Sequence, residues 1–206
     1  MYTPNHFKEA RLPVLQALIE AHPLGAVVTH TAAGLDANHL PFDYRPPTAG
    51  APFGTLRAHV ARANPLWQLA GSEVMVLFQG PHGYISPSLY QEKPVSGKVV
   101  PTWNYAVVHG HGVLRALDDP LWLRALLERL TGHHEAPRAQ PWAVADAPAD
   151  YLDKMLRAIV GIEIVLTGLD GKWKMSQNRV AADQTAIAAE QPALAAWMAP
   201  NPTSGA

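Results

Sequence analysis

The residues of this 206-residue chain that could do chemistry lie in four polar clusters, and the densest one occupies 56–65. It contains Arg57, His59, Arg62 and Asn64, the last directly before a proline. Asparagine followed by proline is typical of the start of a short helix, whose free backbone N–H groups bind anions. Arginine side chains add paired donors that suit a phosphate. The pattern fits a phosphate site and a solvated edge strand with a capped helix equally well.

Three further clusters combine hydroxyl, amide, aromatic and basic side chains. Segment 80–90 carries hydroxyls and rings on turn-forming backbone, 100–105 places Trp103 beside Asn104, and 171–179 is basic. Irregular segments of this kind often contact ligands, and a tryptophan can stack on a planar ligand. The same patterns also fit ordinary turns, a core tryptophan and a solvated hairpin, so the clusters alone select no ligand.

Metal and acyl-transfer chemistry have little support in the sequence. His109 and His111 share one face of a predicted strand, but the chain has no cysteine and no His-Glu-x-x-His spacing. It also lacks a Gly-x-Ser-x-Gly elbow, a Gly-x-Gly-x-x-Gly turn and a phosphate-binding P-loop. We therefore predict no metal site, assign no catalytic residue, and expect the histidines to be core or surface residues.

Composition limits the class of protein and its partners. With 48% hydrophobic and 16% charged residues the chain can bury a core, and 19 prolines and 15 glycines indicate many turns. The absence of cysteine, of a leader pattern and of an apolar run of roughly 20 residues predicts a cytoplasmic protein without a membrane span. The net charge of -1 and the lack of a recognition-helix pattern leave DNA binding possible but unsupported.

Periodicity predicts a mainly β or α+β fold. The predicted strands are 26–30, 35–44, 54–60, 74–78, 84–86, 99–117, 161–169 and 172–176, and the predicted helices are 8–22, 119–132 and 149–158. We expect turns at 79–83 and at Asp170-Gly171. We expect these eight extended segments to give six or seven mostly antiparallel strands, which would form a small barrel with peripheral helices. The tail, 184–206, is expected to hold at most a short helix.

Taken together, the clusters resemble the PaiB family. The segments that carry the resemblance are, in chain order, 6–7, 37–41, 59–65, 80–87, 101–105, 159–163 and 172–179. The family is described as FMN-binding, with the split β-barrel that pyridoxamine-phosphate oxidases and flavin reductases share, and its members are labelled negative transcriptional regulators. The resemblance implies one split-barrel FMN-binding domain over 1–183, and a homodimer with the cofactor between subunits.

The resemblance also implies which residues contact FMN. In split-barrel flavoproteins a strand leading to a short helix holds the phosphate, a role that falls here on His59, Arg62 and Asn64 with Arg57 nearby. Asn38 and His39 would lie along the isoalloxazine ring. The residues expected close to the pocket are Ser86, Thr102, Trp103 and Asn104, and those expected to reach the flavin of the partner subunit are Lys172, Ser176, Gln177 and Arg179. Leu89 stands where the family has an aromatic residue, so this wall of the pocket departs from the family.

Two functions follow from the resemblance. The first is an FMN-binding homodimer that acts in negative regulation of transcription. The alternative is an enzyme: a flavin-dependent oxidoreductase resembling flavin reductases or pyridoxamine-phosphate oxidases, or a haem-handling split-barrel protein. A flavin absorbance band, nicotinamide-driven flavin reduction and a haem Soret band distinguish the two.

Overall fold

The computed structural model describes residues 1–198, and its central feature is one sheet of eight strands. The strands are β1 (Lys8–Glu9), β2 (Leu24–Thr31), β3 (Gly34–Pro41), β4 (Asp43–Arg45), β5 (Thr55–Ala61), β6 (Glu73–Ile85), β7 (Thr102–Leu117) and β8 (Ile159–Lys174). Their order is β3-β2-β6-β7-β8-β5-β4, with β1 paired to β8. The registers of β1 with β8, β2 with β3 and β6, and β5 with β4 and β8 are antiparallel. The predicted antiparallel, mainly β fold is confirmed, with one strand more than the upper estimate.

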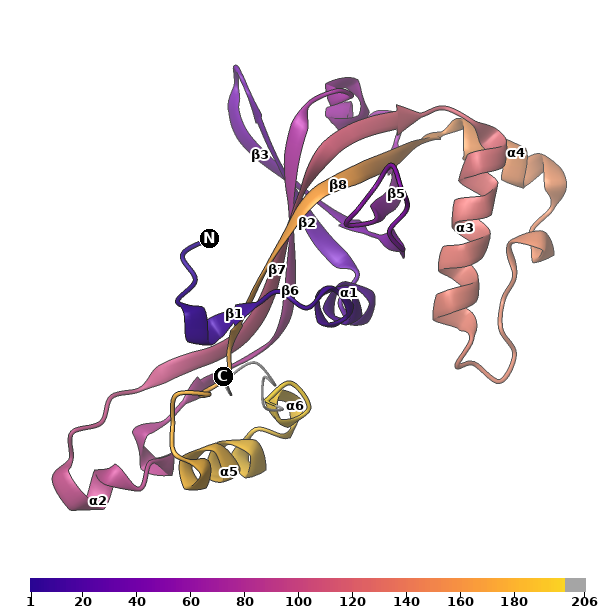
Figure 1. Ribbon diagram of the computed structural model, residues 1–206. Helices are drawn as coiled ribbons and strands as arrows, with labels where there is room; N and C mark the ends of the chain where they lie inside the picture. The colour runs from indigo at the N-terminus through magenta and orange to yellow at the C-terminus, as the bar shows by residue number, and fades with distance from the viewer. Residues whose placement is uncertain (199–206) are drawn as a thin grey trace. The chain divides into compact units, whose positions relative to one another are not determined.

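Helices flank the strands (Figure 1). They are α1 (Leu12–Ala21), α2 (Glu92–Ser96), α3 (Pro120–Glu135), α4 (Ala149–Arg157), α5 (Ala181–Glu190) and α6 (Pro192–Ala195), with 3-10 helices η1 (Asn5–Phe7), η2 (Pro65–Leu69), η3 (Pro87–Leu89) and η4 (Val144–Asp146). Within 1–198, no helix has both the length and the apolar character needed to cross a membrane. α1 is shorter than the predicted 8–22 because Lys8–Glu9 pairs with β8.

Two predicted turns are wrong, because β6 runs without interruption through 79–83 and β8 runs through Asp170-Gly171. The glycines there serve close packing. A Cβ on Gly80 would lie 3.2 Å from the carbonyl oxygen of Ala106, and one on Gly171 would lie 2.7 Å from the carbonyl oxygen of Glu9 and collide with Leu15. Glycine inside a strand often marks such a close approach, and here that use replaces the turn.

The chain divides into two compact units. Within the described chain, the first unit comprises 1–21, 79–109 and 170–198, and the second comprises 22–78 and 110–169. β6, β7 and β8 contribute residues to both.

The second unit has a core on one face of its strands. β5 alternates in burial, so that Leu56, Ala58 and Val60 are buried while Arg57 and His59 on the opposite face are half-buried. α3 adds its buried leucines to this unit, and Asp119 caps it by accepting hydrogen bonds from the first-turn backbone. A second set of apolar side chains in this unit is only half-buried. They are Val28 on β2, Met75 and Leu77 on β6, Val113 on β7 and Val165 on β8.

The first unit is built on α1 and the C-terminal helices. α1 buries Leu15, Leu18 and Ile19, while α5 and α6 bury Ile187 and Leu194. The buried carboxylate of Asp183 accepts a hydrogen bond from the backbone N–H of Gln91 at 2.8 Å. This bond fixes the start of α5 to the segment that leads into α2.

Candidate functional site

The predicted FMN contacts fall into two groups, one in each unit. The second unit holds Asn38, His39, Arg57, His59, Arg62 and Asn64. The first unit holds Ser86, Thr102, Trp103, Asn104, Lys172, Ser176, Gln177 and Arg179.

Arg62 follows β5, and four hydrogen bonds hold its guanidinium within the second unit. Two of its nitrogens donate to the carboxylate of Asp118 at 2.8 and 2.6 Å. The backbone carbonyl oxygens of Arg157 and Ile159 accept further hydrogen bonds at 2.8 and 3.0 Å. Hydrogen bonding between the two side chains raises the pKa of Arg62 and lowers that of Asp118. Arg62 therefore ties the end of β5 to the start of β8, and has little donor capacity left for a ligand.

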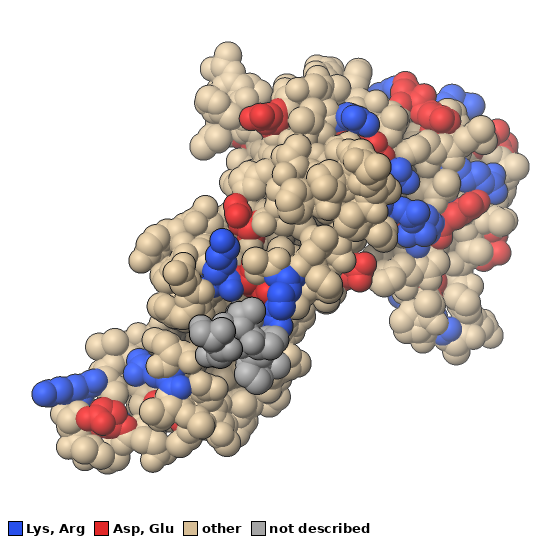
Figure 2. Space-filling model, viewed as in Figure 1, with Lys and Arg blue, Asp and Glu red and all other residues tan. Residues whose placement is uncertain are grey.

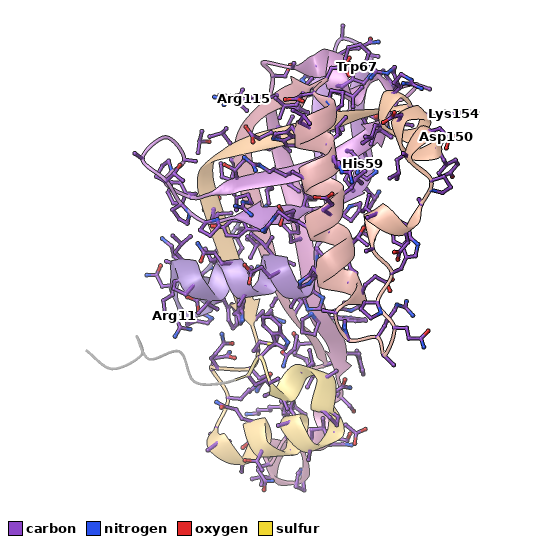
Figure 3. The ribbon with its side chains drawn as sticks, turned by 90° about the vertical axis from the view of Figure 1, so that its right-hand side faces the viewer. Arg11, His59, Trp67, Arg115, Asp150 and Lys154 are labelled. Atoms are coloured by element: carbon purple, nitrogen blue, oxygen red, sulfur yellow. The ribbon has the colours of Figure 1, made fainter. Side chains whose placement is uncertain are left out.

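Arg57 and His59 project from the half-buried face of β5, and β5 packs against α3. Figure 3 shows His59 beside α3. Arg57 donates to Glu163 at 3.0 Å and lies 5.6 Å from the centre of the Trp122 ring. The Nδ1 atom of His59 is buried and makes no hydrogen bond within 1–198. Burial lowers the pKa of His59, because an imidazolium loses hydration there. His59 is thus a neutral histidine beside α3 rather than a cation ready for phosphate.

The structure brings Asn38 and Asn64 together. The side-chain amide of Asn64 donates to the Asn38 oxygen at 2.7 Å, and its own oxygen accepts from the backbone N–H of Leu66 at 2.9 Å. The predicted helix start at Asn64-Pro65 is confirmed, as η2. His39 lies exposed on β3.

The basic residues of the first unit have a different environment. Lys172 donates to the carbonyl oxygen of Tyr2 at 3.0 Å and lies 5.4 Å from the centre of the Tyr105 ring. Lys174 donates to the Thr102 hydroxyl and to the carbonyl oxygen of Trp103.

Arg179 completes this group, with its guanidinium 4.2 Å from the centre of the Tyr90 ring. Within 1–198, no carboxylate forms an ion pair with Lys172, Lys174 or Arg179. Burial first, and then the positive charges of Lys172 and Arg179, lower the pKa of Lys174. An anion placed here would relieve this like-charge repulsion.

Trp103 and Tyr105 share one face of β7; the Tyr105 ring lies beside Lys172, and the Trp103 carbonyl accepts from Lys174. Trp103 is 52% exposed, and its ring centroid lies 5.8 Å from that of His82 and 6.3 Å from that of Tyr84. An exposed ring of this size offers a stacking surface for a planar ligand. We call the set Trp103, Tyr105, Lys172, Lys174 and Arg179 the cation–aromatic face.

Residues predicted to touch FMN also build the turn after β8. Ser176 has a φ of 61°, the left-handed region, and its hydroxyl donates to the buried side-chain oxygen of Asn104 at 3.0 Å. The Asn104 amide nitrogen is buried without a hydrogen-bond partner in the described chain. Gln177 accepts from the backbone N–H of Met175 at 2.7 Å. These bonds hold the segment that joins Lys174 to Arg179.

The sequence prediction missed Lys174 as a site residue. The signal was present, since Lys172 and Lys174 alternate along a strand with Trp173 and so share a face. Ser86, one of the predicted contacts, caps η3 by accepting a hydrogen bond from the backbone N–H of Ser88.

Comparisons with known proteins agree on family and fold. Residues 1–168 match the family described as "Putative FMN-binding domain". The Uncharacterized protein AN0679 of Emericella nidulans is 35% identical, with 91% of this chain and 88% of that protein covered. The Protease synthase and sporulation protein PAI 2 of Bacillus subtilis is 32% identical, with 89% and 85% covered.

Two solved structures share the fold at low sequence identity. The Flavocytochrome Anf3 from Azotobacter vinelandii has a TM-score of 0.56 and 14% identity, covering 81% of this chain and 69% of that one. The FAD and Heme binding protein from Mycobacterium smegmatis has a TM-score of 0.54 and 17% identity, covering 86% and 78%. The unclosed, mostly antiparallel sheet with its helices is the expected split β-barrel. This chain belongs to the PaiB family of FMN-binding domains.

Proposed function

We propose that the cation–aromatic face of the first unit binds FMN, and that the protein acts as a homodimeric, flavin-dependent regulator in the cytoplasm. The observation that carries the proposal is the group of three cations, Lys172, Lys174 and Arg179, which no carboxylate in 1–198 neutralises. A phosphate monoester carries a charge of about -1.5 to -2 at neutral pH and accepts several hydrogen bonds. The FMN phosphate therefore matches the charge and the donors of this group.

We assign the residues of this face different roles in binding FMN. Lys172 and Lys174 would donate to the phosphate, Trp103 would stack on a ring, and the Asn104–Ser176 bond would keep the segment after β8 in place. When bound, the isoalloxazine supplies one- and two-electron redox chemistry.

We assign the predicted residues of the second unit a supporting place in this proposal. A phosphate at Arg62 would have to displace the Asp118 carboxylate and two backbone carbonyls. At Lys172 and Lys174 it would have no carboxylate to displace. Asn38, His39, Arg57, His59 and Asn64 stay candidates for the rest of the cofactor.

The homodimer is supported by the half-buried apolar residues of the second unit. Val28, Met75, Leu77, Val113 and Val165 lie half-buried on β2, β6, β7 and β8. A second copy covering them would remove apolar surface from water. Leu77→Glu should convert a dimer to a monomer in light scattering, while Leu35→Glu on β3, where the side chain is 77% exposed, should not. A monomeric parent protein would contradict this part.

The regulatory role is supported by the similarity to the Bacillus subtilis protein named for protease synthesis and sporulation. On the face in Figure 2, the described acidic and basic side chains are interspersed, so the view gives no extended basic surface for DNA. We therefore favour regulation through bound flavin over direct contact with DNA. A gel shift at low salt, where phosphate attraction is strongest, would contradict this preference.

The test is a calorimetric and absorbance titration of the protein with FMN. Lys174→Met should weaken FMN binding roughly 10- to 100-fold, because a charge-assisted hydrogen bond contributes about 1.5 to 3 kcal/mol. The matched control Lys98→Met removes an exposed lysine of the same unit and should bind FMN like the parent. No flavin binding by the parent protein, or equal affinity in both variants, would overturn the proposal.

A further inference from the structure

The first unit contains a cavity of about 390 Å³ on the opposite side of β8 from Lys172 and Lys174. Strand alternation separates the two places: Trp173 and Met175 are buried and line this cavity, whereas the lysines lie on the other face. Its volume lies within the range of small-molecule sites. No residue of the cation–aromatic face lines it.

The walls of the cavity are largely aromatic and apolar. Trp173 and Trp197 lie with ring centroids 6.3 Å apart and planes tilted by 42°, and α1 contributes Val14 and Ala17. The ring spacing leaves no room for a ligand between them, so a ligand ring would pack against their outer faces. These walls favour a flat, apolar ring system.

The polar end of the cavity offers mostly donors. Glu9, which is 3% exposed, accepts from the backbone N–H of Arg11 at 2.8 Å, from its Nε at 2.9 Å and from its Nη2 at 2.6 Å. The carboxylate is thus occupied. The Arg11 side chain remains 37% exposed beside α1 (Figure 3), with its Nη1 group unused by these bonds. An arginine with free donors binds an oxyanion better than a neutral oxygen.

We propose that this cavity, the Trp173 cavity, binds an aromatic monocarboxylate, with the ring against the tryptophans and the carboxylate on the free donors of Arg11. The volume admits one fused ring system with a short acidic side chain. Binding requires no change of protonation in the protein, because the Arg11 guanidinium is always charged. The site is separate from the cation–aromatic face, because Trp173 and Met175 point away from Lys172 and Lys174; of the predicted FMN contacts, only Gln177 lines this cavity.

The experiment is calorimetry of the full chain with indole-3-acetate, compared with indole-3-acetamide. We expect the acid to bind with a Kd below about 1 mM and at least about tenfold more tightly than the amide, because only the acid gains a charged bond to Arg11. Absence of binding, or equal binding of acid and amide, would overturn the proposal.

Three variants locate the site without removing the Glu9–Arg11 pair. Ala17→Trp fills the cavity from α1 and should reduce the affinity for indole-3-acetate at least about tenfold. Ala21→Trp, at the exposed end of the same helix and outside the cavity, should not. Lys174→Met should leave indole-3-acetate binding unchanged. Loss of binding in Lys174→Met, or retention in Ala17→Trp, would assign the acid to another place and refute the inference.

Discussion

Three arginines of the second unit and the lysines of the cation–aromatic face in the first unit have opposite kinds of partner. In the second unit, Arg57, Arg62 and Arg129 each contact a carboxylate, within 3.0 Å or less. In the first unit, Lys172 and Lys174 contact hydroxyl, carbonyl and ring groups. A paired arginine joins elements of the fold, whereas a cation without a carboxylate remains available to an anionic ligand. A charged residue is therefore a candidate for binding when no carboxylate already pairs with it, and its presence in a polar motif is not enough.

The largest expected effect comes from removing both lysines of the first unit. Lys172→Met combined with Lys174→Met should lower FMN affinity by about a hundredfold or more, since two charge-assisted bonds are lost at once. The measurement is a flavin fluorescence titration at constant ionic strength. An FMN affinity of the double variant within about threefold of the parent would show that these lysines do not bind the phosphate.

The second prediction concerns the paired arginine. Arg62→Met should lower the thermal midpoint of unfolding, because the carbonyls of Arg157 and Ile159 and the carboxylate of Asp118 lose their donors together. FMN affinity should change less than about threefold, far less than in the lysine variant. Scanning calorimetry and the same titration measure both quantities. A stable Arg62→Met protein that no longer binds FMN would reverse the assignment of the two regions.

Local sequence signals predicted the fold wherever the partners are near in the chain. Asn64 caps η2 and Asp119 caps α3, each through backbone groups two residues ahead. Gly80 and Gly171 were misinterpreted as turn residues, because the side chains and carbonyls that press on them come from distant segments. The residue types and alternation of β8 predicted a strand. Its uninterrupted course through Asp170-Gly171 could not be predicted, because it depends on packing against α1.

The site was harder to predict than the fold because ion pairing is non-local. Asp118 lies 56 residues from Arg62, and Glu163 lies 106 residues from Arg57. Nothing in the polar motif at 56–65 shows that its arginines are already engaged. The resemblance to the family named the cofactor, and the contacts then indicated which cations are available to it.

A third prediction concerns the Glu9–Arg11 ion pair of the first unit, which is not part of the cation–aromatic face. Burial works to raise the pKa of Glu9, but the hydrogen bonds and charge of Arg11 outweigh it, and the pKa is lowered from 4.5. The pair should therefore stabilise the fold above the unfolded-state pKa and lose that contribution as pH falls through the folded-state pKa. Glu9→Gln should flatten the acid side of a plot of unfolding free energy against pH. An unchanged acid limb would count against it.

The smallest expected effect concerns His59 in the second unit. Burial lowers its pKa below 6.5, so its neutral form is favoured in the fold. Its contribution to stability should be present above the unfolded-state pKa and decline as pH falls toward the folded-state value. His59→Gln should lose that decline as the pH falls below the unfolded-state pKa of about 6.5. A steep, unchanged decline in the variant would show that another group titrates.

The most direct test of the central claim compares FMN with riboflavin, which lacks only the phosphate. The parent protein should bind FMN at least about tenfold more tightly than riboflavin, and the Lys172→Met, Lys174→Met protein should bind the two almost equally. Arg62→Met should keep the preference of the parent. A preference that survives loss of both lysines, or that disappears in Arg62→Met, would contradict the assignment of the phosphate to the first unit.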